Sequence, residues 1–305
     1  MAFKLTILGS NSALPAYGRN HTAQALEVGK FTFLIDCGEG TQVRMTANKI
    51  KYHKIDHIFI SHLHGDHYLG LVGLLSSMHL HKRAKELTLY APNGLQEILL
   101  TQFKYSNTQL NYRIKFVELD PAGSQQLINN STLSVTTFKL DHRITCLGFL
   151  FKEKAKPYRI NKEKLPKGLT LANIGRLKKG EDAIDQEGKV IFKNSELTLP
   201  AKNSRSYAYC SDTQYNEELL PFISGVDLLY HESTFLNEDE LRASNTYHST
   251  ARQAAEIAKK ASVGQLLIGH FSARYRDINP FLEEATKVFP NTSLAIEGKS
   301  FDIPE

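Results

Sequence analysis

The chain of 305 residues lacks the long apolar run that a membrane-spanning helix requires. No apolar segment approaches the roughly 18 residues needed to cross a bilayer. The first residues, MAFKLTILGS, also lack the charged region, the long apolar region and the small-residue cleavage site of a secretory signal peptide. These absences argue against an integral membrane protein, and we expect no membrane partner and a cytoplasmic location.

Cysteine is also scarce, with only Cys37, Cys146 and Cys210, which lie far apart and form no CxxC pair. An odd number of widely separated cysteines argues against a disulfide framework and favours a reducing compartment. We therefore expect all three to be small buried hydrophobic residues. No internal repeat of solenoid period occurs either, which argues against a repeat protein.

The charge of the chain is unevenly distributed. The net charge is +5, yet residues 152–180 alone hold ten Lys or Arg against two acids, Glu163 and Glu153, and carry +8. The rest of the chain therefore sums to 5 − 8 = −3. A slightly acidic body with one strongly basic segment predicts a polyanionic partner that meets this segment.

Apolar patterning predicts an α/β protein. Strand patterns occur at 3–9, 21–36 (a hairpin around Gly29), 55–62, 86–92, 113–119, 132–140, 147–151, 206–212, 226–232 and 264–271, and helical patterns at 37–49, 68–81, 93–103 and 249–261. Residues 152–202 show little periodicity and read as an insertion. We expect two sheets sandwiched between helices, formed by residues 1–151 and 203–305, with a projecting arm at 152–202.

Histidines and aspartates recur where the predicted strands end. The stretch FISHLHGDHYLG (59–70) places three histidines and one aspartate in six positions, and three further candidates follow other strands. Such loops are where an α/β scaffold presents ligands and catalytic groups. Taken singly, each later residue has a structural alternative, but the shared strand-end position favours a common site. The set comprises His62, His64, Asp66, His67, His142, Asp212 and His270.

These residue types are typical of a metal centre. Imidazole nitrogens and carboxylate oxygens bind zinc and similar ions, and His62 and His64 project to one side of an extended segment. Seven ligands exceed the three or four that one zinc takes. If Asp212 bridges, they divide into His62, His64 and His142 for one ion and Asp66, His67 and His270 for a second. Two adjacent ions can clamp a phosphoryl or carbonyl centre.

The stretch SHLHGDH resembles the signature of the metallo-β-lactamase fold, and the chain as a whole resembles the ribonuclease Z family of tRNA 3′-processing endonucleases, in its short form. The resemblance extends over nearly the whole chain. Its motifs are LGSNSALPAYGRNHTA (8–23), DCGEGTQVRM (36–45), HESTF (231–235), YHST (247–250) and GHFSARY (269–275).

The resemblance implies a zinc-dependent endoribonuclease that removes the 3′ trailer of precursor tRNA. It implies two zinc ions per subunit on the seven residues above, with Asp66 as proton acceptor for the attacking water. His248, oriented by Glu232, would assist the leaving oxygen, although both could instead be structural residues at a helix start. The implied substrate contacts are Arg274 on the scissile phosphate and Arg19 and Asn20 beside the tRNA end. A homodimer is also implied, with the arm 152–202 holding the tRNA.

One segment departs from the family pattern, because Gly168-Leu169 stands where a Gly-Pro pair is usual in the arm. Two other functions compete with the main interpretation. The first is a hydrolase of the same fold that acts on another small ester or thioester, or on a different nucleic acid. The second is an RNA-binding module whose metal site is only structural.

Overall fold

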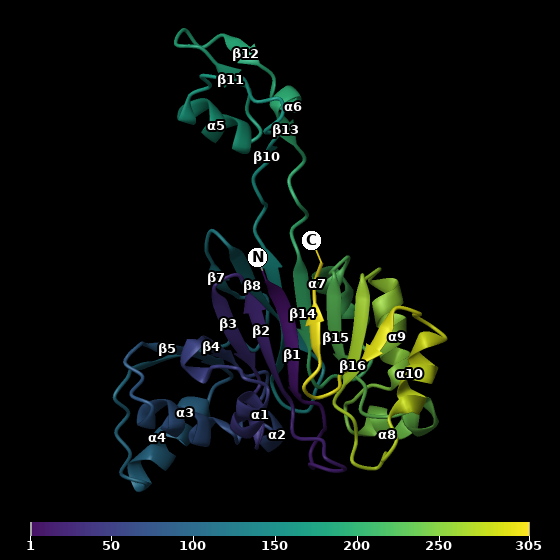
Figure 1. The fold of residues 1–305 in the computed structure, drawn as a ribbon. Helices are drawn as coiled ribbons and strands as arrows, with labels where there is room; N and C mark the ends of the chain where they lie inside the picture. The colour runs from purple at the N-terminus through teal and green to yellow at the C-terminus, as the bar shows by residue number, and fades with distance from the viewer. Residues whose placement is uncertain (1, 305) are drawn as a thin grey trace.

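In the computed structural model, which describes residues 2–304, two seven-stranded sheets pack face to face and helices cover their outer faces (Figure 1). The first sheet has the order β18-β1-β2-β3-β4-β5-β6 and the second β17-β16-β15-β14-β9-β8-β7. Both sheets are mixed. The predicted sandwich of two mixed sheets flanked by helices is therefore confirmed.

The first sheet and its helices come mainly from the amino-terminal half of the chain. Its strands are β1 (Phe3–Gly9), β2 (Ala23–Val28), β3 (Phe31–Ile35), β4 (Ile55–Phe59), β5 (Leu87–Ala91), β6 (Ile114–Glu118) and β18 (Ser300–Asp302). The helices here are α1 (Thr41–Ala47), the 3₁₀ turn η1 (Tyr52–Lys54), α2 (Gly65–Tyr68), α3 (Leu71–Leu80) and α4 (Leu95–Tyr105).

The second sheet comes from the remainder of the chain. Its strands are β7 (Gln126–Asn129), β8 (Leu133–Leu140), β9 (Cys146–Glu153), β14 (Ser206–Cys210), β15 (Leu228–Glu232), β16 (Gln265–Gly269) and β17 (Thr292–Leu294). Its helices are η2 (Glu217–Leu219), α7 (Leu220–Ile223), η3 (Asn237–Asp239), α8 (Glu240–Asn245), α9 (Ala251–Lys260) and α10 (Asn279–Thr286).

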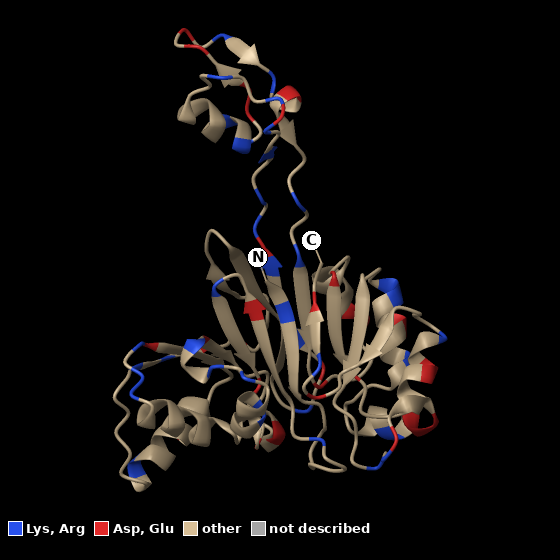
Figure 2. Ribbon diagram, in the orientation of Figure 1, with Lys and Arg blue, Asp and Glu red and all other residues tan. Residues whose placement is uncertain are grey.

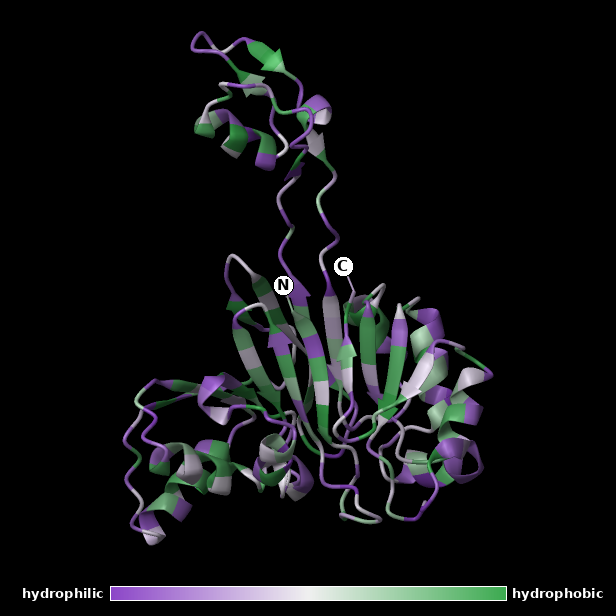
Figure 3. Cartoon of the chain, viewed as in Figure 1, coloured by the Kyte–Doolittle hydropathy of each residue, from purple (hydrophilic) through white to green (hydrophobic). Residues whose placement is uncertain are grey.

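Aromatic side chains fill the space between the sheets. Phe33 and Phe59 of the first sheet pack against Phe151 of the second, with ring centroids 5.4 and 5.3 Å away. Figure 3 shows hydrophobic residues along the strands of both sheets. Two further apolar clusters lie between the sheets and their helices, so the core has three layers. Cys37, Cys146 and Cys210 are buried and free, as the sequence predicted.

Strand direction explains where polar side chains gather. β3, β4, β5 and β6 run parallel, as do β14, β15, β16 and β17. β8 is antiparallel to β9, which is antiparallel to β14, so β8 runs with the second set. The carboxyl ends of these strands meet at the edge of the sandwich opposite the arm (Figure 1).

Residues between β9 and β14 leave the sandwich and return to it (Figure 1). They form β10 (Arg159–Ile160), α5 (Leu171–Lys178), β11 (Ala183–Ile184), β12 (Val190–Phe192), α6 (Asn194–Leu197) and β13 (Thr198–Leu199). This arm has a small core of its own around Leu177, Ala183 and Leu197. Among residues 2–304, no helix has the length and apolar content to cross a membrane.

Candidate metal centre

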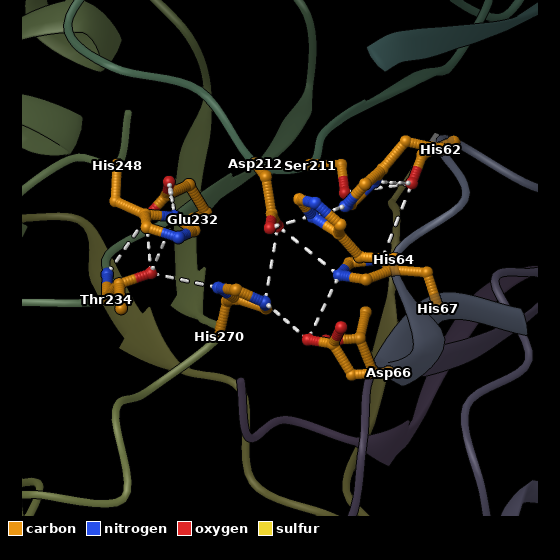
Figure 4. A network of polar contacts seen from close by, with 12 residues as sticks. His62, His64, Asp66, His67, Ser211, Asp212, Glu232, Thr234, His248 and His270 are labelled. Atoms are coloured by element: carbon orange, nitrogen blue, oxygen red, sulfur yellow. Dashed lines mark hydrogen bonds and ion pairs between the residues drawn. The ribbon is translucent and has the colours of Figure 1, made fainter. Parts of the chain in front are cut away.

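All seven predicted ligands lie together at the carboxyl ends of the strands, and Figure 4 labels six of them, all but His142. His62 and His64 follow β4, and Asp66 and His67 lie in α2. The other three follow β8, β14 and β16 and are His142, Asp212 and His270. The side chains therefore come from five segments that the two sheets bring to one edge.

The predicted ligands form two groups of neighbouring atoms. The first group contains three histidines and one carboxylate oxygen. His64 Nδ1 lies 3.0 Å from His62 Nε2 and 3.2 Å from His142 Nε2. Asp212 Oδ2 lies 3.5 Å from His62 Nε2 and 3.9 Å from His142 Nε2. Donors at about 2.0–2.1 Å from one tetrahedral ion lie roughly 3.3–3.4 Å apart, so this spacing fits a zinc-sized ion.

The second group shares Asp212 with the first. Asp212 Oδ1 lies 3.4 Å from His67 Nε2 and 3.2 Å from His270 Nε2. Asp66 Oδ2 lies 3.5 Å from the same two nitrogens. The two oxygens of Asp212 thus face different groups, which is the arrangement of a bridging carboxylate.

Within the described residues 2–304, three buried atoms of this cluster have no hydrogen-bond partner, namely His67 Nε2, His270 Nε2 and Asp212 Oδ1. Buried polar atoms without partners are costly and rare in native proteins. Since both nitrogens lie within 3.4 Å of Asp212 Oδ1, a cation between the three atoms would satisfy all of them. The side chains present therefore fit a divalent metal.

The electrostatics of the cluster favour a positive charge. Burial lowers the pKa of His67, but Asp212, Asp66 and Asp36 outweigh it and hold the pKa well above its ordinary value. Burial raises the pKa of Asp66, yet His67 and His270 outweigh it and keep this carboxyl ionised. The protein thus concentrates carboxylates where a cation would lie.

Further contacts hold the histidine rings in place. His67 Nδ1 lies 2.8 Å from Asp36 Oδ2, and His142 Nδ1 lies 2.9 Å from the Tyr247 carbonyl oxygen. His62 Nδ1 lies 3.0 Å from the Ser61 hydroxyl, which also contacts Asp36 at 2.9 Å. Such contacts at the second ring nitrogen fix the tautomer of a metal-binding histidine.

Beside the cluster, Glu232 and His248 form a close pair. His248 Nδ1 lies 2.7 Å from Glu232 Oε1, and Glu232 is fully buried at the end of β15. Burial lowers the pKa of His248, but the charge and hydrogen bond of Glu232 outweigh it and raise the pKa to about 9. His248 also lies close enough to Asp212 and His270 to form a third potential metal group with them. Geometry therefore allows His248 to act either as an acid or as a ligand.

An open cleft of about 500 Å³ leads to the cluster. Arg274, which the family resemblance implies as a substrate contact, lines this cleft, and its side chain is exposed. Two arginines that the sequence analysis did not select, Arg143 and Arg242, line the same cleft. Arg143 directly follows the predicted ligand His142 in the sequence, which is the one signal that could have drawn attention to it.

Arg19 and Asn20 are placed differently. Arg19 donates from Nε to Asn11 Oδ1 at 2.7 Å and from Nη2 to the Tyr275 carbonyl oxygen at 2.6 Å. Asn20 Nδ2 donates to Glu297 at 2.7 Å. Neither lines the cleft, so both side chains hold the 11–21 loop against the carboxyl-terminal half. The sequence analysis did not anticipate these protein contacts.

Comparison with known proteins places the chain in a family. Residues 3–158 match the family model of the anti-Pycsar protein Apyc1, and residues 188–271 match the beta-lactamase superfamily domain. The chain is similar to Ribonuclease Z of Cytophaga hutchinsonii, at 51% identity over all of this chain and 97% of that protein, and of Bacteroides fragilis, at 45% over 97% of each. Human tRNase Z, short form, has the same fold, with a TM-score of 0.72 at 24% identity over 99% of this chain and 100% of its own. This chain therefore belongs to the ribonuclease Z family and has the metallo-β-lactamase fold.

Proposed function

We propose that the protein is a zinc-dependent endoribonuclease that cleaves the 3′ trailer from precursor tRNA and leaves a 3′ hydroxyl. The convergence of seven ligand side chains on two neighbouring positions carries this proposal, together with full-length relatives named Ribonuclease Z. The residues suited to hold two zinc ions are the two groups described above, bridged by Asp212. Bound there, zinc would activate a water and neutralise charge that develops at phosphorus.

The protein side chains would manage the protons of the reaction. Asp66 lines the cleft, so it is placed to accept the proton of the attacking water. His248, whose pKa is raised to about 9 by Glu232 despite burial, is protonated near neutrality and can donate to the departing 3′ oxygen. Because Glu232 fixes Nδ1, the opposite ring nitrogen is the one available to the substrate.

Cationic groups would hold the RNA around the chemistry. Arg274 is suited to bind the scissile phosphate through its planar fork. We extend this role to Arg143 and Arg242, since they lie on the same wall and have no ion-pair partner among residues 2–304. Arg19 and Asn20 would contribute by keeping the neighbouring loop in place for the tRNA end.

The arm is suited to hold tRNA at a distance from the cleft. Residues 152–202 contain 13 Lys or Arg and seven Asp or Glu, and the excess lies in the part before residue 181. Figure 2 shows Lys and Arg along the segments that join the arm to the sheets and acidic residues near its far end. Phosphate contacts need charge more than sequence, so the missing Gly-Pro pair does not remove this function.

We also expect two copies of the chain to associate in the cytoplasm. Val43, Leu69 and Leu80 leave apolar side chains exposed around helices α1 to α3, at 70%, 51% and 75%. Analytical ultracentrifugation tests this expectation, and a monomer at micromolar concentration would contradict it.

The decisive experiment incubates the purified protein with a precursor tRNA, with and without a chelator, and maps the new 3′ end. A single metal-dependent cut at the end of the acceptor stem supports the proposal. A thioester and a model phosphodiester are assayed in parallel. Hydrolysis of the thioester without cleavage of RNA would favour the other hydrolase function, and RNA binding without any cleavage would favour a binding module.

A further inference from the structure

Thr234 lies between the Glu232–His248 pair and the metal cluster (Figure 4). It belongs to the loop after β15, and its side chain is buried. Its hydroxyl oxygen lies 2.8 Å from Glu232 Oε2 and 2.9 Å from His270 Nδ1. The proposed chemistry gives Thr234 no role.

The donors and acceptors around the Thr234 hydroxyl allow only one arrangement of its hydrogen bonds to Glu232 and His270. A hydroxyl has one hydrogen and two lone pairs, and an ionised carboxylate only accepts. The Glu232 carboxylate already accepts from the backbone N–H groups of Thr213 and Thr234 and from His248 Nδ1, so its surroundings are those of an ionised acceptor. The Thr234 hydrogen therefore goes to Glu232, and its oxygen can only accept a hydrogen from His270 Nδ1.

In the neutral imidazole that binds a metal, a hydrogen on Nδ1 leaves His270 Nε2 with its lone pair. That nitrogen is buried without a hydrogen-bond partner and faces Asp212 Oδ1 at 3.2 Å and Asp66 Oδ2 at 3.5 Å. The backbone of His270 has a φ of 64°, in the left-handed region that few side chains other than glycine adopt. A strained backbone and a fixed tautomer thus present one nitrogen to the cluster.

We propose that Thr234 is a positioning residue for the metal centre, which sets the tautomer and orientation of His270 and ties them to the Glu232–His248 pair. A single carboxylate then serves two histidines, holding His248 through Oε1 and His270 through Oε2 and Thr234. The inference rests on the proposed assignment of His270 as a metal ligand.

The test compares two substitutions at this position in the full-length protein. Thr234→Val keeps the shape of the side chain and removes the hydroxyl, whereas Thr234→Ser keeps the hydroxyl. Thr137→Val is the matched control. Thr137 is also buried, but it lies in β8 and its hydroxyl bonds the Gln125 backbone instead of any residue of the metal cluster. Zinc affinity and stoichiometry are measured by competition with a chromophoric chelator, and the His270 tautomer by ¹⁵N NMR of histidine-labelled protein.

We expect Thr234→Val to bind one of its two zinc ions about 10- to 100-fold more weakly, as is typical when such a supporting contact is lost. Thr234→Ser and Thr137→Val should keep wild-type affinity, and wild-type His270 should carry its hydrogen on Nδ1. Wild-type affinity for both ions in Thr234→Val would overturn the inference. So would the absence of a hydrogen on Nδ1 of His270 in the wild type, a measurement that stands even if Thr234→Val fails to fold. If the wild type itself binds no zinc, the proposed function fails instead.

Discussion

Replacing Glu153 by glutamine should destabilise the protein, because its carboxylate forms a buried ion pair with Arg205 at the base of the arm. Glu153 is the last residue of β9, and Arg205 precedes β14. Arg205 donates from Nε to Glu153 Oε2 at 2.9 Å and from Nη2 to Oε1 at 2.7 Å, and Lys156 Nζ lies 2.9 Å from Oε2. Both Glu153 and Arg205 are buried. Loss of one partner would leave the other as a buried charge with a weakened counterpart.

The pKa of Glu153 gives the magnitude. Burial raises this pKa, but Arg205 and Lys156 outweigh it and lower the pKa from 4.5 to about 2. At about 1.4 kcal/mol per pKa unit, the difference of about 2.5 corresponds to about 3 kcal/mol of stability. With about 2.1 cal/mol/K of unfolding entropy per residue, that loss lowers the Tm of a chain of this length by about 5 °C.

The contribution also depends on pH. Since the folded pKa is depressed, the stabilisation is complete above pH 4.5 and is lost as the pH falls toward 2. The difference in stability between wild type and Glu153→Gln should therefore shrink to roughly half at pH 3.

Scanning calorimetry at pH 7 and pH 3 measures both effects. Glu27→Gln is the matched control, because Glu27 pairs with Lys4 at the surface, where an ion pair contributes about 0–1 kcal/mol. A Tm for Glu153→Gln within 1 °C of that control, or a difference that grows at low pH, would refute the reasoning.

Three further predictions concern the site and the arm. His64→Ala should abolish binding of one metal ion and RNA cleavage together, whereas the exposed His81→Ala should change neither, as metal analysis of the purified variants will show. His248→Ala should lower kcat on precursor tRNA by about 10²–10⁴-fold with little change in tRNA affinity, and wild-type turnover would contradict its role as an acid. Changing three arm lysines to glutamine should raise KM for tRNA. The same change should reduce the steepness with which log affinity falls against log salt by up to about 3, as measured by filter binding. An equal effect from three lysines of the body would contradict a special role for the arm. The arm set is Lys162, Lys164 and Lys167, and the body set is Lys49, Lys51 and Lys54.

The sequence predicted the sandwich and the convergence of the ligand residues for a clear physical reason. Apolar strands and helices have strong periodicity, and parallel strands place their carboxyl ends at one edge. A histidine or aspartate just after such a strand, as at Asp212 or His270, is therefore placed by the fold. The ligand roles themselves stay predictions until metal is measured.

Other structural features have no recognisable pattern in the amino-acid sequence. The strands β10 and β11 of the arm have two residues each, and the arm core joins Leu177, Ala183 and Leu197 across 20 residues of sequence. Neither the strands nor the core therefore has a periodic pattern that could predict it. The left-handed backbone of Asp36 and His270 follows from tertiary packing. Contacts such as those of Arg19 with Tyr275 join positions 256 residues apart, which a single sequence cannot reveal.

The separate apolar cluster of the arm has a consequence for how this enzyme can change over time. Among residues 2–304, the apolar cluster around Leu177 and Ala183 shares no member with the cluster between the two sheets. The effects of substitutions in the arm cluster should therefore add to those of substitutions near the metal centre. If the arm binds RNA as proposed, substitutions in it can change which RNA the protein binds without changing the site of chemistry. Substitutions at Glu153 or Arg205 are different, because this buried ion pair joins the two strands from which the arm leaves.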